Sequence, residues 1–134
     1  MKQSGSRAGT IAIVDDDEPL REALCSVMKA AGFSTRAFAS AEAFLDADAC
    51  QQTACLILDV RLPGISGIEL HKRLLDDNCA VPVIFVTAHG DASLRESLLK
   101  AGAAGFMNKP VRSAILLKEI DAALEMSGHD ESSR

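Results

Sequence analysis

Apolar and polar residues follow two different rhythms along this chain. Three short runs, Thr10–Val14, Ala54–Leu58 and Val81–Val86, are almost entirely apolar, as expected of strands that are covered on both faces of a sheet. Phe33–Phe38 is more polar, which predicts an edge strand, and Ala104–Asn108 is a short fifth candidate. The pattern therefore predicts five strands distributed over most of the chain.

Helical spacing of apolar residues follows each of these strands. Capping residues and glycines mark the boundaries: Pro19 and Gly32 for the first helix, Ser40 for the second, Ser66 with Glu69 for the third, Gly102 for the fourth and Ser113 for the fifth. The positions expected to face the core are Leu20, Leu24, Val27, Met28, Phe44, Leu45, Leu70, Leu74, Leu94, Leu98, Leu116, Ile120 and Leu124. Strands that alternate with helices predict an α/β fold with a parallel sheet and right-handed crossovers.

Length and composition are those of one globular domain. The 134 residues are 48% hydrophobic and 25% charged, and no apolar run approaches the ~20 residues of a membrane span. The first residues carry no hydrophobic signal region, so we expect a cytoplasmic protein without membrane contact. Residues 1–8 are expected to be a disordered lead, 9–126 the domain, and 127–134 a loose tail or the start of a linker.

Charge and side-chain chemistry narrow the function. With a net charge of −5 the domain offers no basic stripe for phosphates, so we expect a protein partner and no direct contact with nucleic acid. The four cysteines, Cys25, Cys50, Cys55 and Cys79, form no C-x-x-C pair. Most of them are expected to be small buried thiols, and a role in a disulfide or a zinc site is not expected. His71 is expected to be solvated on a polar helix face.

Polar residues follow four of the predicted strands, at the edge where open α/β sheets place their functional crevice. They are Asp15, Asp16 and Asp17 after the first strand, Asp59 after the third, Thr87 after the fourth and Lys109 after the fifth. Residues far apart in the sequence should therefore meet at one edge of the sheet.

This set of residues predicts phosphoryl chemistry. Asp15, Asp16 and Asp59 crowded together should resist ionisation without a cation, and oxygen ligands in a compact site favour Mg²⁺, with Mn²⁺ as a substitute. Asp59 is the natural nucleophile, because a carboxylate can take up a phosphoryl group as a mixed anhydride. Lys109 and Thr87 would hold the phosphoryl oxygens.

Simpler interpretations apply to some of the same residues. Asp17 and Glu18 are expected to start the first helix, where acids are favoured, with Glu18 at the cap position before Pro19. His89 fits an exposed loop residue as well as a functional one. Phe106 taken alone would most often be a core residue.

Four motifs, VDDDE, LDVRLPGISG, VTAHGD and NKP, resemble the hallmarks of the two-component response-regulator receiver domain. The resemblance runs from Thr10 to Met126. It implies a doubly wound (βα)5, flavodoxin-like three-layer sandwich with a parallel sheet of order 2-1-3-4-5. It also implies a signalling domain rather than an ordinary enzyme, which promotes its own phosphotransfer and dephosphorylation.

The resemblance also implies a role for each matching residue. Asp59 would accept a phosphoryl group from a histidine kinase, a histidine phosphotransfer protein or a small phosphodonor. The implied ligands of Mg²⁺ are Asp16 directly, Asp15 through water, Asp59, and the backbone carbonyl of Arg61. Lys109 and Thr87 match the lysine and hydroxyl that contact the phosphate.

The family's switching parts can be placed in the same way. Thr87 and Phe106 match the switch residues, Arg61 and His89 occupy the positions that tune phosphoryl lifetime, and Lys109–Pro110 matches a bond that is usually cis. Switching would act on the face formed by the fourth helix, fifth strand and fifth helix. That face would signal to an output domain or a target protein, and a homodimer could form through it.

Two other function classes fit the sequence less well. A haloacid-dehalogenase-like phosphatase needs D-x-D-x-[T/V] after the first strand, and Pro19 stands where Thr or Val belongs. A receiver-like module that signals by binding alone has no feature in its favour, since the site is complete. SAEAFL and VTAHGD resemble receivers fused to a LuxR-type helix-turn-helix domain, so the chain is either a stand-alone regulator or part of a longer one.

Overall fold

A computed structural model describes residues 9–132, with side chains for residues 9–126. Its centre is a parallel sheet of five strands in the order β2-β1-β3-β4-β5. The strands are β1 (Thr10–Val14), β2 (Ser34–Phe38), β3 (Thr53–Asp59), β4 (Val83–Thr87) and β5 (Gly105–Asn108). This order confirms the predicted topology.

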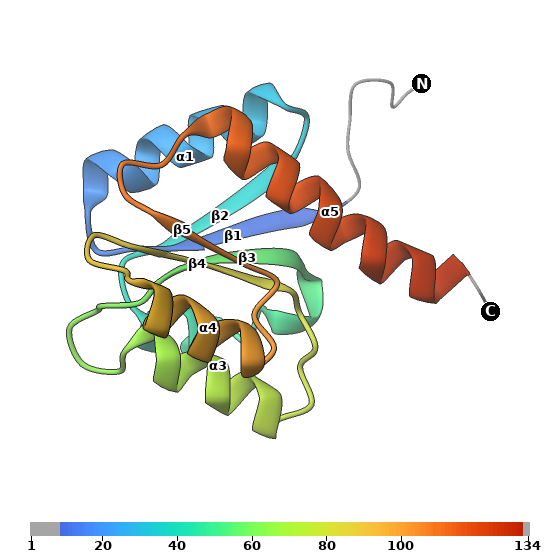
Figure 1. Cartoon of the computed structure of the whole chain (residues 1–134). Helices are drawn as coiled ribbons and strands as arrows, with labels where there is room; N and C mark the ends of the chain where they lie inside the picture. The colour runs from blue at the N-terminus through green and yellow to red at the C-terminus, as the bar shows by residue number, and fades with distance from the viewer. Residues whose placement is uncertain (1–8, 133–134) are drawn as a thin grey trace.

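Helices cover both faces of the sheet, with α1 and α5 on one side and α3 and α4 on the other (Figure 1). The helices are α1 (Glu18–Ala30), α2 (Ala41–Asp46), the 3₁₀ helix η1 (Cys50–Gln52), α3 (Gly67–Asp76), α4 (Ala92–Lys100) and α5 (Ser113–Ser132). None of the helices between residues 9 and 132 combines the length and apolar character that a membrane span requires.

The core has two halves because strand side chains alternate between the faces of the sheet. In β1, Ile11 and Ile13 join the half beneath α1 and α5, whereas Ala12 and Val14 join the half shared with α2, α3 and α4. All four are fully buried. Burial on both faces explains why the central strands have nearly continuous apolar sequences.

Two strands end one residue later than the sequence pattern indicates. Asp59 pairs with Val86 in the ladder between β3 and β4, and Thr87 pairs with Asn108 between β4 and β5. Both polar residues are therefore the last residues of their strands rather than the first residues of loops. A ladder position holds each backbone rigidly, which fixes where the side chain points.

The start of α1 differs from the prediction. Asp17, not Glu18, is the N-cap: its backbone is extended and its carboxylate accepts a hydrogen bond from Leu20 N–H at 3.3 Å. The shorter Asp side chain reaches back to the first turn, as N-caps require. The predicted caps Ser40 and Ser66 are confirmed by hydrogen bonds of 3.0 and 3.1 Å to backbone N–H groups.

At the other end of the domain, α5 continues to Ser132, past Met126, where the sequence led us to expect a loose tail. Extending an existing helix adds one hydrogen bond for each residue fixed, so a helix can outlast its packed turns. The predicted lead, residues 1–8, and residues 133–134 lie outside the described residues.

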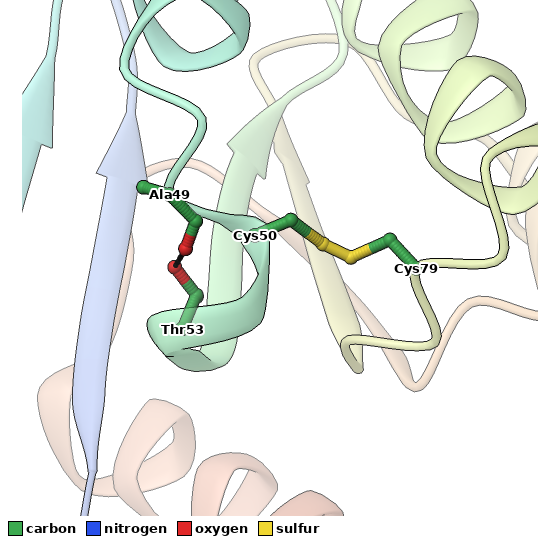
Figure 2. Close-up of a disulfide and its surroundings, with 4 residues drawn as sticks. All are labelled: Ala49, Cys50, Thr53 and Cys79. Atoms are coloured by element: carbon green, nitrogen blue, oxygen red, sulfur yellow. Dashed lines mark hydrogen bonds between the residues drawn. A yellow bond between two sulfur atoms is a disulfide. The ribbon is translucent and has the colours of Figure 1, made fainter.

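The expectation that no cysteine takes part in a disulfide is wrong. Cys50 and Cys79 form a disulfide across a sequence separation of 29 (Figure 2). Cys50 precedes β3 and Cys79 precedes β4, and because these strands are neighbours their amino ends bring the two residues together. Cys25 and Cys55 are free. The pairing depends on strand order, which spacing in the sequence does not reveal.

His71 also differs from its prediction. It lies on α3 with only 5% of its surface exposed, and its ring meets the ring of Phe85 edge-on at 5.4 Å between centroids. One position along the helix from the buried Leu70, it extends the apolar face rather than the polar one. Burial lowers the pKa of the His71 imidazole below its usual 6.5.

This burial predicts a dependence of stability on pH. Below pH 6.5 the unfolded chain protonates His71 while the folded protein does not, so stability is lost as pH falls from 6.5 toward the lower folded pKa. The variant His71→Gln should lose less stability than the wild type between about pH 7.5 and about pH 5.5, measured by urea unfolding. Lys72→Gln, an exposed neighbour, is the control and should follow the wild type; identical slopes in all three proteins would contradict the prediction.

Candidate functional site

The predicted site residues meet at the carboxyl edge of the sheet. β1, β3, β4 and β5 are consecutive neighbours, so Asp59 and Thr87 at the ends of β3 and β4 lie between the residues that follow β1 and β5. Asp15 and Asp16 follow β1, and Lys109 follows β5. The backbone N–H of Lys109 donates to the carbonyl of Thr87 at 2.8 Å, which ties the last two strand ends together.

Asp59 lies at the centre of this edge and is 4% exposed. Its Oδ1 accepts a hydrogen bond from the backbone N–H of Arg61 at 3.1 Å, and its Oδ2 accepts one from Lys109 Nζ at 3.0 Å. The start of α3 packs directly against its backbone, since a Cβ on Gly67 would overlap the carbonyl oxygen of Asp59. The carboxylate is therefore held on both oxygens and cannot drift from the edge of the sheet.

Lys109 joins two carboxylates. Its Nζ lies 3.0 Å from Asp59 Oδ2 and 3.1 Å from Asp15 Oδ2. Burial by itself would lower the pKa of the Lys109 ammonium, but the hydrogen bonds and charges of Asp59 and Asp15 outweigh burial and raise it. Lys109 is therefore a permanent positive charge in this site. The Lys109–Pro110 bond is cis, as predicted.

Asp15 is only 1% exposed, and burial raises the pKa of its carboxyl group. Two contacts partly offset this rise in the pKa: the Asp17 N–H donates to Asp15 Oδ1 at 2.8 Å, and the Lys109 ammonium lies nearby. The negative charge of Asp59 raises the Asp15 pKa further. Oδ2 is within ion-pair distance of Lys109, yet no described donor makes a well-directed hydrogen bond to it. An unsatisfied buried carboxylate oxygen is costly.

Together these carboxylates fit a divalent cation. Oxygen atoms of Asp15, Asp16 and Asp59 all lie within 4.8 Å of one another. If all three carboxylates ionise, the single positive charge of Lys109 balances one of them, and two negative charges remain in excess. An oxygen-only donor set with one buried oxygen that lacks a hydrogen bond, Asp15 Oδ2, and one exposed member, Asp16, suits a hard cation that keeps some of its water.

Thr87 and Phe106 meet beside Gly90. Thr87 is fully buried and its Oγ1 accepts a hydrogen bond from His89 N–H at 3.3 Å. A Cβ on Gly90 would overlap the tip of the Phe106 ring, the methyl group of Thr87 and the Asn108 side chain. The absence of a side chain at position 90 therefore leaves the space in which these residues approach one another.

Arg61 and His89 have exposed side chains in the loops after β3 and β4. Among the contacts of the described residues, the Arg61 backbone contributes its N–H to Asp59, and its predicted role as a carbonyl ligand stays a prediction. Asp17 caps α1, as its simpler interpretation requires, and lies outside the carboxylate cluster.

Three supporting residues escaped the sequence analysis. The Arg21 guanidinium donates to the carbonyl of Asp15 at 2.8 Å, and Asn108 Oδ1 accepts from Gly90 N–H at 2.9 Å. Glu42 on α2 accepts from Ile65 N–H at 3.0 Å in the loop after β3, and this hydrogen bond lowers its pKa. Asn108 could have been suspected from its place beside Lys109. Glu42 carries no signal, because α2 is brought to that loop only by the fold.

Comparisons with known proteins agree with this geometry. The family model of the response regulator receiver domain matches residues 11–121 of this chain. The chain belongs to the response-regulator receiver family. It is therefore a receiver domain of two-component signalling, and the haloacid-dehalogenase-like alternative is not supported.

Individual relatives are moderately similar in sequence and close in structure. The response regulator protein TodT of Pseudomonas putida is 38% identical over 132 residues, which are 98% of this chain and 58% of TodT. The transcriptional regulatory protein FixJ of Azorhizobium caulinodans is 38% identical over 127 residues, 92% of this chain and 60% of FixJ. The solved response regulator StyR superposes with a TM-score of 0.85 at 38% identity, covering 96% of this chain and 65% of StyR. The chain thus spans about three fifths of these proteins.

Proposed function

We propose that this receiver accepts a phosphoryl group on Asp59 and signals through its fourth and fifth helices. The observation that supports this most is the Asp59 carboxylate: it is nearly buried, is paired with Lys109 at 3.0 Å, and shares a cluster with Asp15 and Asp16. Residues 9–126 would form the receiver, with 127–134 as its tail or linker.

In the proposed transfer, an oxygen of Asp59 attacks the phosphorus of a phosphohistidine. The phosphorus–nitrogen bond breaks with its electron pair returning to the imidazole, and an acyl phosphate forms on Asp59. Lys109 shifts from the carboxylates to a phosphoryl oxygen as a fixed positive charge. The donor is a histidine kinase, a histidine phosphotransfer protein or a small phosphodonor, and the same site would promote the later hydrolysis.

The cation proposed for this site is Mg²⁺, with Mn²⁺ as a substitute. Asp16, Asp59 and the Arg61 carbonyl would hold it directly and Asp15 through water. When bound, Mg²⁺ would neutralise charge on the phosphoryl oxygens during transfer. Without a cation, the excess negative charge around Asp59 would repel the phosphodonor.

Phosphorylation adds roughly −1.5 to −2 charges at the edge of the sheet. We infer that Thr87 moves toward the phosphoryl oxygens and that Phe106, whose ring tip lies beside Gly90 near the Thr87 methyl group, turns into the space that Thr87 leaves. The α4-β5-α5 face would then favour a second of two existing states. That face would contact an output domain, a target protein or a second copy of the chain.

Two further properties belong to the same proposal. Arg61 lies two residues after Asp59 and His89 two residues after Thr87. Their exposed side chains would slow hydrolysis of the phosphoryl group by hindering the attacking water.

A receiver that exchanges phosphoryl groups with a kinase would work in the cytoplasm, the compartment that supplies the kinase with ATP.

The proposed function is tested by incubation with acetyl phosphate. With Mg²⁺ the intact mass should rise by one phosphoryl group, and the addition should map to the peptide that carries Asp59. In EDTA the addition should fall at least about 100-fold, because the transferred charge is no longer neutralised. Absence of labelling with Mg²⁺ would overturn phosphoacceptance, and steady turnover of a phosphomonoester would favour a hydrolase instead.

A further inference from the structure

The disulfide between Cys50 and Cys79 lies away from the proposed phosphotransfer site. Cys50 opens η1 just before β3, Cys79 lies between α3 and β4, and the two are separated by 29 positions in sequence. Both segments lead into the amino ends of their strands, whereas Asp59 and Thr87 end the same strands. The bond is therefore at the opposite edge of the sheet (Figure 2).

Both cysteines line a surface hollow. The hollow has a volume of about 180 Å³, and its walls include Phe44, Leu74, Asp48 and Asp77 besides the two cysteines. Cys50 is partly exposed and Cys79 is 7% exposed. Cys50 is thus the more accessible of the two cysteines that line the hollow.

The two segments that carry the cysteines are also held by contacts other than the disulfide. The segment before β3 is held by the Thr53 hydroxyl, which donates to the carbonyl of Ala49 at 2.8 Å, and the loop after α3 by Cys79 N–H, which donates to the carbonyl of Leu74 at 2.8 Å. Both cysteines also pack against the apolar core. Reduced thiols, which behave as small apolar groups, could occupy the same positions.

Neither remaining cysteine competes for the pair. Cys55 is fully buried, and burial raises the pKa of its thiol to about 12, so it supplies no thiolate. Cys25 is on α1 and packs in the other half of the core, across the sheet. The intramolecular disulfide is thus confined to Cys50 and Cys79, whereas the partly exposed Cys25 can form only a mixed disulfide with a reagent.

We propose that Cys50 and Cys79 form a reversible thiol–disulfide exchange site for small disulfides and thiols of neutral or positive charge. The Cys50 thiolate attacks the reagent disulfide, releases one reagent thiolate and forms a mixed disulfide. The Cys79 thiolate then attacks the Cys50 sulfur, forms the protein disulfide and expels the second thiolate. The protein loses two electrons, the reagent gains them, and the two thiol protons pass through solvent to the released thiolates.

The preferred charge of the reagent follows from the walls of the hollow. Asp48 and Asp77 are exposed residues that line the same hollow as the two cysteines. They repel an anionic reagent such as oxidised glutathione and attract a cationic one such as cystamine. In the cytoplasm proposed above, disulfides are usually transient or redox-sensing, which agrees with exchange rather than a permanent cross-link.

Oxidation should stabilise the receiver. The bond closes a loop with a sequence separation of 29 that contains β3, Asp59 and α3, and such a constraint lowers the entropy of the unfolded chain. The chain oxidised with cystamine should melt roughly 10 °C higher than the chain reduced with cysteamine. Cys50→Ser/Cys79→Ser should show no redox-dependent shift, and Cys25→Ser should keep it.

Peptide mapping and exchange rates complete the test. Oxidation should link the Cys50 and Cys79 peptides. At low salt, the ratio of the cystamine rate to the oxidised-glutathione rate should be roughly tenfold higher in the wild type than in Asp48→Asn/Asp77→Asn. The proposal fails if oxidised and reduced wild type melt together, if other cysteines are linked, or if excess thiol cleaves the bond only after unfolding. An unchanged rate ratio in the double variant would overturn the charge preference. None of these outcomes depends on phosphorylation of Asp59.

Discussion

Asp59→Asn should reduce labelling by acetyl phosphate in Mg²⁺ to background. The amide keeps the shape of the side chain and an oxygen for the Arg61 N–H at 3.1 Å. It is a poor nucleophile, however, and the variant lacks the charge that pairs with Lys109 at 3.0 Å. Intact-mass measurement at several times should show the phosphorylated species in the wild type and none above background in the variant.

The control for this experiment is Asp91→Asn. Asp91 is the N-cap of α4, where its side chain accepts a hydrogen bond from Leu94 N–H at 2.8 Å, and Asn serves equally well as a cap. This variant should be labelled like the wild type. If Asp59→Asn is labelled to the same extent as the control, the nucleophile is another residue and the assignment is wrong.

Asp15→Asn should stabilise the metal-free protein and abolish its response to Mg²⁺. Because the folded pKa of Asp15 is raised, its charge opposes folding, and this loss of stability is complete above the folded pKa. Removing the charge, with Lys109 still paired to Asp59, should raise the free energy of unfolding by about 1 kcal/mol near neutral pH.

In the wild type, Mg²⁺ at about 100 times its dissociation constant should add about 2.7 kcal/mol. Asp15→Asn should lose most of this gain, so the order of stability of the two proteins reverses when Mg²⁺ is added. Urea unfolding with EDTA and with Mg²⁺ measures both effects. Asp17→Asn is the matched control, since Asp17 is a neighbouring acid outside the cluster, and it should respond to Mg²⁺ like the wild type. Equal gains in wild type and Asp15→Asn would refute the metal site at Asp15.

The crowded carboxylates have opposite effects in the metal-free and the metal-bound protein. Crowded carboxylates cost stability in the metal-free protein, as the unsatisfied Asp15 Oδ2 shows, and the same crowding makes the site favourable for a cation. Function is therefore retained at the expense of stability, which is common at active sites.

The sequence by itself determined the alternation of strands and helices and which polar residues follow the strands. A central strand is buried on both faces and therefore has a nearly continuous apolar sequence, whereas a helix buries one face and has apolar residues at helical spacing. These two patterns predict the alternation of strands and helices. Since parallel strands share one carboxyl edge, Asp15, Asp59, Thr87 and Lys109 could be placed together without coordinates.

Only the tertiary structure decided which distant side chains meet away from that edge. Cys50 and Cys79 pair because β3 and β4 are neighbours, and Glu42 reaches Ile65 because α2 lies beside the loop after β3. His71 is buried because Phe85 lies opposite it on β4. Local patterns record whether a residue is buried or capped within its own element, whereas these contacts depend on the arrangement of whole elements, which no short segment of sequence encodes.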